Sequence, residues 1–270
     1  MKIAYTGWTW LVNHKENRTY DLEQAIKECK SLGYDYLENF AFIADFYEDP
    51  NELKALLEKY DANMVNLYGH FRDNPETDYE NCFKQIDFLA AIGGTHYNCQ
   101  GNTWKEEPFV RPLNKEKILE YADLCNRLGA HAKEKGITLC FHPHANTAVF
   151  AEDQIDFFIA NTDASVVKLC LDTAHTTIAG MCTVSAFDKF ADRIAYVHLK
   201  DVDPTEAKSA TPMKSFRALG LGIVDFVGVV NVLKKHGYDG VLCVELDNPE
   251  VCNYQSAEVS RKYIRNALKM

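Results

Sequence analysis

The sequence predicts an α/β protein whose strand–helix units close into a (β/α)8 barrel, the TIM-barrel architecture. Segments typical of strands and of helices alternate along the whole chain, which implies a parallel sheet. Eight such units in 270 residues fit a closed barrel, whereas an open doubly wound sheet usually has fewer. No linker, low-complexity tract or change of composition interrupts the alternation. We therefore expect a single domain over residues 1–270.

The first four units occupy the N-terminal half of the chain. Short apolar runs predict their strands, at Lys2–Gly7, Tyr34–Asn39, Asn63–Gly69 and Thr95–Gln100. Amphipathic segments predict their helices, at Asp21–Leu32, Asn51–Tyr60, Tyr79–Ile92 and Lys115–Lys135. Glycine follows three of these helices, as is common where a helix ends in left-handed backbone.

The last four units read as nearly continuous apolar strands, which is typical of strands buried on both faces. We expect these strands at Ile137–His142, Val166–Asp172, Ile194–His198 and Gly240–Glu245. The matching helices are expected at Glu152–Ala160, Thr183–Phe190, Asp225–Lys235 and Gln255–Leu268. A long polar insertion is expected from Asp201 to Leu221, and Asp225 is expected to cap the helix that follows it.

The composition restricts the class of partner. A net charge of −10 argues against broad binding to nucleic acid or to anionic membranes, and no apolar run approaches the length of a membrane span. The nine cysteines form no CxxC pair, and most sit inside apolar runs, so we expect reduced, buried thiols and a cytoplasmic protein. The first residues are too mixed in character for a signal peptide.

Acids and histidines follow four successive predicted strands. The candidate metal ligands among these residues are His142, Asp172, His198 and Glu245. Because the carboxyl ends of barrel strands meet at one rim, we expect these side chains to converge on a divalent metal. Each residue also has an ordinary structural interpretation, such as Asp172 capping a helix or Glu245 pairing with a surface cation. Four such coincidences at matching strand ends are a poorer explanation than a shared site.

Further candidates surround these strand ends. His144, His175 and Lys200 could act as base or acid, and Glu245 could itself take a proton. Residues expected to contact a substrate are Glu38, His70, Trp104 and Arg217. Lys200 could instead lie in a solvated turn, and the aromatic residues near the first four strand ends could be either core packing or an apolar wall for a ring-shaped substrate. The Gly220-Leu-Gly222 loop lacks a complete phosphate-binding pattern, so we expect an unphosphorylated substrate.

Several of these motifs resemble the xylose isomerase-like TIM-barrel superfamily of sugar isomerases and epimerases. The motifs are Leu171–His175, Tyr196–Asp201, Leu219–Phe226 and Val244–Glu245. Phe141-His142-Pro-His144-Ala-Asn-Thr147 looks like the inosose dehydratase branch. The resemblance implies one divalent metal, Mn or Co before Zn, Fe or Mg, held by His142, Asp172, His198 and Glu245. Sugar epimerases of the superfamily have a glutamate where this chain has His142, which removes one of the two bases that epimerisation uses.

The leading hypothesis is therefore a metal-dependent lyase or isomerase that abstracts the proton next to the ketone of a keto-sugar or keto-cyclitol, most like inosose dehydration. Three alternatives remain open: a ketose isomerase or epimerase, a 3-keto-glycoside lyase resembling a C-deglycosidase subunit, and a non-catalytic sugar-binding barrel. We expect a small sugar or cyclitol as partner, no nucleic acid or membrane, and a homo-oligomer or hetero-oligomer.

Overall fold

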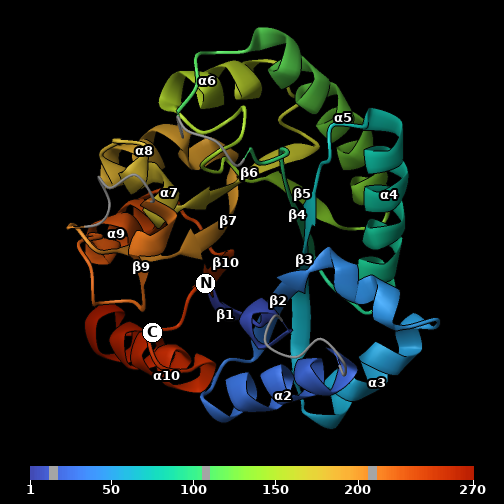
Figure 1. Ribbon diagram of the computed structural model, residues 1–270, viewed down its shortest axis with the longest axis vertical. Coiled ribbons are helices and arrows are strands. Elements are labelled where there is room, and N and C mark those ends of the chain that lie inside the picture. The colour runs from blue at the N-terminus through green and yellow to red at the C-terminus, as the bar shows by residue number, and fades with distance from the viewer. Residues whose placement is uncertain (12–17, 105–109, 206–211) are drawn as a thin grey trace.

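The computed structural model describes residues 1–11, 18–104, 110–205 and 212–270. Parallel strands close into a barrel in the order β1-β10-β7-β6-β5-β4-β3-β2, which confirms the predicted (β/α)8 fold. Figure 1 shows the helices forming a ring around these strands. The barrel strands are β1 Lys2–Thr6, β2 Tyr36–Phe40, β3 Asn63–His70, β4 His96–Gln100, β5 Thr138–Phe141, β6 Val167–Asp172, β7 Ile194–Leu199 and β10 Val241–Val244.

The long helices agree with the expected segments to within a few residues. They are α2 Arg18–Ser31, α3 Pro50–Lys59, α4 Pro75–Ala91, α5 Lys115–Glu134, α6 Glu152–Ala160, α8 Thr183–Phe190, α9 Phe226–Lys235 and α10 Asn253–Tyr263. Short elements that the periodicity did not predict are α1 Trp8–Leu11, α7 Thr173–Ile178, η1 Ala41–Phe46, η2 Ala191–Arg193 and η3 Pro212–Ser215, whereas η4 Ile264–Leu268 continues α10 to the end of the predicted last helix. Such short turns lack enough residues to show a helical period.

Apolar packing divides between the outside and the inside of the barrel. The large cluster lies between the strands and the surrounding helices, and contains Leu37, Leu139 and Leu242. The smaller cluster lines the barrel interior with small or polar-tipped side chains, including Cys140, Cys170, Tyr196 and Cys243. Seven of the nine cysteines are buried and none is in a disulfide, as expected, whereas Cys182 and Cys252 are exposed. None of the helices in the described ranges is long and apolar enough to cross a lipid bilayer.

The segment after β7 differs from the expected polar insertion. Its described residues include an antiparallel ribbon of β8 Asp201–Val202 and β9 Phe216–Arg217. Val202, Phe216 and Ala218 from this segment are buried in a small apolar cluster of their own. The polar character of the sequence arises from residues between the two ribbon strands. Because these residues separate two very short strands, the hydrophobic pattern of the sequence did not predict the ribbon.

A buried carboxylate organises the loop that follows the ribbon. Asp201 is 1% exposed, and its two oxygens accept hydrogen bonds from the backbone of Val202, Gly220, Gly222 and Val224, at 2.9–3.1 Å. A Cβ on Gly222 would lie 2.4 Å from Asp201 Oδ1, so glycine is required for this close approach. The glycine-rich loop thus encloses an anion that belongs to the protein itself. Asp225 caps α9 through Gly228 N, as predicted.

Asp201→Asn should destabilise the fold by about 3 kcal/mol, because the amide NH2 group faces buried backbone donors that then lack an acceptor. Urea unfolding followed by circular dichroism measures the change. Asp203→Asn is the matched control, since Asp203 is partly exposed and pairs with Arg217, so it should change stability by less than about 1 kcal/mol. Equal destabilisation by the two substitutions would contradict this role for Asp201.

Candidate functional site

The four predicted metal ligands meet at one end of the barrel. His142 follows β5, Asp172 ends β6, His198 lies in β7 and Glu245 follows β10. The strand register pairs Asp172 with His198, and His198 with Cys243, so neighbouring strands present these side chains at similar heights. One potential ligand atom from each of the four residues lies within 4.8 Å of every other, and all four residues are buried.

Each of these four side chains also has one buried polar atom without a hydrogen-bond partner. The atoms are His142 Nε2, Asp172 Oδ2, His198 Nδ1 and Glu245 Oε2. Buried polar atoms are nearly always paired, so four unpaired atoms in one place indicate a missing shared partner. His198 Nδ1 lies 2.9 Å from Glu245 Oε2, yet the two atoms lack the alignment of a hydrogen bond. Two nitrogen and two oxygen donors suit a divalent transition metal.

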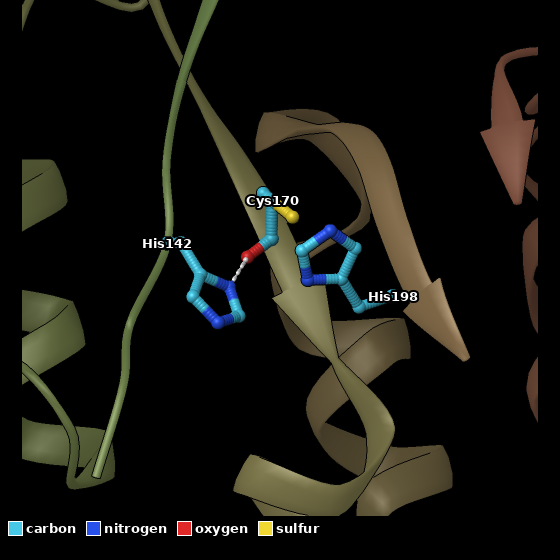
Figure 2. A group of neighbouring side chains, drawn as sticks. All are labelled: His142, Cys170 and His198. Carbon is cyan, nitrogen blue, oxygen red and sulfur yellow. Dashed lines mark hydrogen bonds between the residues drawn. The ribbon is translucent and has the colours of Figure 1, made fainter. Parts of the chain in front are cut away.

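The remaining atoms of the same side chains are held by fixed partners. His142 Nδ1 donates to Cys170 O at 3.1 Å, and Figure 2 shows the rings of His142 and His198 beside this contact. Asp172 Oδ1 accepts from Ala174 N at 2.6 Å and His175 N at 2.8 Å, which starts α7. Asp172 therefore fulfils both interpretations, because one oxygen caps a helix and the other faces the cluster. Because Nδ1 of His142 carries the proton of this hydrogen bond, the lone pair of the neutral ring is on Nε2, the atom that faces the cluster.

Glu38 lies beneath the cluster and orients His198. His198 Nε2 donates to Glu38 Oε2 at 2.9 Å, which directs Nδ1 towards the other ligands. The same carboxylate accepts from Asn66 Nδ2 at 2.6 Å and Asn98 Nδ2 at 3.3 Å, and Glu38 is 2% exposed. This arrangement differs from the expected contact with a substrate hydroxyl, because the carboxylate is buried and already engaged.

Lys200 is a fully buried cation among acids. Its Nζ lies 3.0 Å from Glu245 Oε1, 3.1 Å from Asp247 Oδ2 and 3.8 Å from Asp172 Oδ2. Burial lowers the pKa of Lys200, but the charges of Asp247, Glu245 and Asp172 together raise it above its ordinary value. The Phe216 ring lies 4.4 Å from Nζ and covers it. Lys200 is thus a fixed positive charge within the site, which differs from a solvated turn.

Burial and neighbouring charges also shift the pKa values of the four predicted ligands. Burial raises the pKa of Asp172 to about 7, with Lys200 opposing and Glu245 adding to the shift. Burial likewise raises the pKa of Glu245, but Lys200 and His198 outweigh burial and hold it well below its ordinary value. Burial and then the charge of His198 lower the pKa of His142, which keeps that ring neutral. For His198, burial is outweighed by Cys170, Glu38 and Glu245, which raise its pKa.

His144 and His175 form a pair beside the cluster, with ring centroids 4.0 Å apart. The backbone of Ala145 holds both rings: His144 Nδ1 donates to Ala145 O at 2.6 Å, and Ala145 N donates to His175 Nδ1 at 3.3 Å. Burial lowers the pKa of both histidines, and that of His144 to about 4, so both rings are neutral at pH 7. One residue thereby fixes opposite tautomers, with a lone pair on His144 Nε2 and a proton on His175 Nε2.

The other predicted contact residues lie further from the ligands. His70 packs against the rings of Phe40 and Tyr68, and burial lowers its pKa to about 3. Trp104 lies under the Arg111 guanidinium, 4.1 Å from it. Arg217 donates to the backbone oxygens of Lys214 and Phe216 and pairs with Asp203 at 3.2 Å, which differs from a substrate clamp.

Sequence reasoning missed several residues of the site. Asp247 shares Lys200 with Glu245, Phe216 covers Lys200, and the backbone of Ala145 holds the two histidines. Asp247 follows the same strand end as Glu245, and that position could have indicated it. A backbone contact such as that of Ala145 leaves no signal in the residue type.

The family model for the xylose isomerase-like TIM barrel matches residues 26–267. The chain belongs to this family. An inosose dehydratase of Clostridium beijerinckii is 34% identical to it over 97% of this chain and 95% of that protein. The crystal structure of an IOLI protein with a bound zinc atom superposes with a TM-score of 0.80 at 18% identity, covering 100% of this chain and 98% of the other. The probable 3-DHS dehydratase AsbF of Bacillus anthracis superposes with a TM-score of 0.76 at 14% identity, covering 98% and 99%. The two structural likenesses concern the fold.

Asp172→Asn should lower metal affinity at least about tenfold, because it removes a charged oxygen from the cluster of this family member. Asparagine also caps helices well, so α7 should still begin at the same residue. Elemental analysis of the purified protein after dialysis measures bound Mn, Co, Zn and Fe. Asp247→Asn is the matched control, since Asp247 contacts Lys200 but is not one of the four clustered ligands. Unchanged metal content in Asp172→Asn would remove this residue from the ligand set.

Glu38→Gln should weaken metal binding by about tenfold, because a neutral amide orients His198 less strongly and makes it a poorer ligand. A metal titration against a competing chelator measures the affinity. Glu23→Gln, which alters a partly exposed acid paired with Lys59, should leave the affinity unchanged. A Glu38→Gln affinity equal to that of the unsubstituted protein would show that the buried hydrogen bond does not tune the site.

Proposed function

We propose that the protein is a metal-dependent dehydratase that removes water from a keto-cyclitol or keto-sugar, with an inosose as the leading substrate. The observation that carries the proposal is a pair of histidines, His144 and His175, which are held in opposite tautomers directly beside the four-residue cluster. The rings of His144 and His175 lie 5.5 and 5.3 Å from that of His142. The similarity to inosose dehydratases over nearly the whole chain supports the same reaction class.

Mn or Co is the metal we propose first, with Zn, Fe and Mg as alternatives, held by His142, Asp172, His198 and Glu245. The zinc atom of the IOLI protein supports a divalent cation in this family. When bound, such a cation would polarise the substrate ketone and make the adjacent C–H bond more acidic. Mixed nitrogen and oxygen ligands are compatible with all of these metals, and the metal that binds depends on the supply of each metal as well as on its affinity for the ligands.

The histidine pair supplies a base and an acid in defined positions. His144 Nε2 carries a lone pair and takes the proton from the carbon next to the ketone. His175 Nε2 carries a proton and donates it to the hydroxyl that leaves the next carbon. The proton taken by His144 then passes to His175, so both rings return to the neutral form and one molecule of water is lost in total. His175 Nε2 is buried and has no hydrogen-bond partner, which is consistent with a donor that awaits a substrate oxygen. Lys200 remains charged and balances the carboxylates.

Elimination fits this site better than epimerisation between two carboxylates. Glu245, which could serve as a base, already pairs with Lys200. The Tyr68 ring also lies 5.5 Å from the His142 ring, and Tyr68 stacks on Phe40. An aromatic wall offers a surface for the ring of a cyclitol but no second base, which epimerisation of this type requires.

The direct test uses protein stripped with EDTA, then reconstituted with Mn or Co, and supplied with an inosose in deuterated water. We expect activity only after reconstitution, loss of water detected by mass spectrometry, and a conjugated ketone detected by near-ultraviolet absorption. An epimer or isomer that has lost no water and carries deuterium at the carbon next to the ketone would instead support a ketose isomerase or epimerase. Activity only with 3-keto-glycosides would support the glycoside lyase, and no turnover of any ketone would support a non-catalytic barrel.

His144→Gln should lower kcat by about 10²–10⁴-fold, because the variant lacks the base that takes the substrate proton. Metal content should stay the same, since His144 is outside the four-ligand cluster. Steady-state kinetics and elemental analysis of the same sample separate the two effects. His236→Gln is the control, because His236 pairs with Asp188 on the surface and should keep full activity. A His144→Gln enzyme with unchanged kcat would assign proton removal to another group.

A further inference from the structure

A cavity lies at the same end of the barrel as the four-residue cluster, between the loops that follow β3, β4 and β5. Its volume is about 350 Å³, and the residues that line it include Asp73, Asn102, Trp104, Arg111, Lys117 and Tyr121. This volume falls within the range of small-molecule sites and is larger than a single inorganic ion needs. The cavity is therefore large enough for a ring.

The cavity wall is joined to the loop that carries the histidine pair. Trp104 N donates to Asn146 O at 2.9 Å, and Asn146 follows the residue that holds His144 and His175. Ala148, further along the same loop, also lines the cavity. A ligand in this cavity would therefore lie against the back of the loop that positions the proposed base and acid.

The charged residues in and beside the cavity are not all paired with one another. Asp73 is fully engaged, because it accepts from Tyr121 at 2.7 Å and Asn102 at 2.8 Å and lies 3.4 Å from Lys117. Lys117 also pairs with Glu120 at 3.0 Å. Arg111 stacks on the Trp104 ring at 4.1 Å, and no carboxylate among the described residues lies within ion-pair distance of it. Among the described residues of the cavity wall, Arg111 is thus the cation that has no carboxylate partner.

We propose that this cavity binds an anionic ring, a cyclic molecule bearing a carboxylate or an equivalent acid. The Arg111 guanidinium lies over the Trp104 ring, and its N–H groups can donate two parallel hydrogen bonds to a carboxylate. Aromatic and amide side chains around it provide contacts for the ring itself. The acid is either a substituent on an extended substrate or a separate small molecule. The first of these assignments rests on the proposed function.

The binding test uses EDTA-treated protein, with benzoate as the charged probe and benzamide as its neutral counterpart, in ligand-observed NMR titrations. We expect benzoate to bind at least about tenfold more tightly than benzamide, and Arg111→Ala to weaken benzoate about tenfold, because a charge-assisted hydrogen bond is lost. Arg111→Lys should retain part of the affinity. Lys115→Ala is the matched control, since Lys115 faces Phe157 and does not line the cavity.

No saturable benzoate binding, equal binding of benzamide, or undiminished binding to a folded Arg111→Ala variant would each overturn the proposal. Thermal unfolding verifies that each variant is folded. Inhibition of the reconstituted enzyme by benzoate then identifies the source of the acid. If benzoate raises KM alone, the acid belongs to an extended substrate. If benzoate changes kcat, the acid is a separate ligand. The NMR arm needs no turnover, so benzoate binding that depends on Arg111 would stand even if the dehydratase proposal failed.

Discussion

The burial of several like charges at the end of a closed barrel is the constraint on which the site depends. Asp172, Glu245, Glu38 and Asp247 are all in or beside one cluster, where isolated carboxylates would be strongly destabilising. Lys200 offsets part of this charge, and hydrogen bonds from backbone and asparagine donors offset more. Four unpaired atoms remain, one from each residue of the cluster, and the proposed dication would satisfy all of them together.

Local backbone structure decides which atom each side chain presents. The turn into α7 occupies Asp172 Oδ1 and leaves Oδ2 free, and the carbonyl of Cys170 occupies one nitrogen of His142. Ala145 then imposes different tautomers on two neighbouring rings that have the same chemistry. The site is therefore specified by main-chain hydrogen bonds as much as by residue type, and small shifts of these loops would exchange donors for acceptors.

The barrel and the convergence of His142, Asp172, His198 and Glu245 were predictable because parallel strands impose a repeating geometry. Apolar runs identify the strands, and their carboxyl ends share a rim, so an acid or a histidine at that position carries information. Glu38 could not be assigned in this way, since its partner His198 is 160 residues away and the pairing depends on barrel closure. The engagement of Arg217 and the burial of Lys200 depend on the β8–β9 ribbon, whose two strands are too short to have a detectable period.

His142 changes the electrostatics of the site as well as the number of possible bases. A carboxylate at this position would add another negative charge beside Asp172 and Glu245, and would raise the cost of burying the cluster. In the proposed metal site, a neutral imidazole would keep the number of ligands and leave a bound dication less neutralised, so the dication would polarise a ketone oxygen more strongly. With histidine at position 142, the proposed site also lacks a carboxylate there that could exchange a proton on the second face of a sugar. A single residue can thus favour loss of water over inversion of a stereocentre within one barrel architecture.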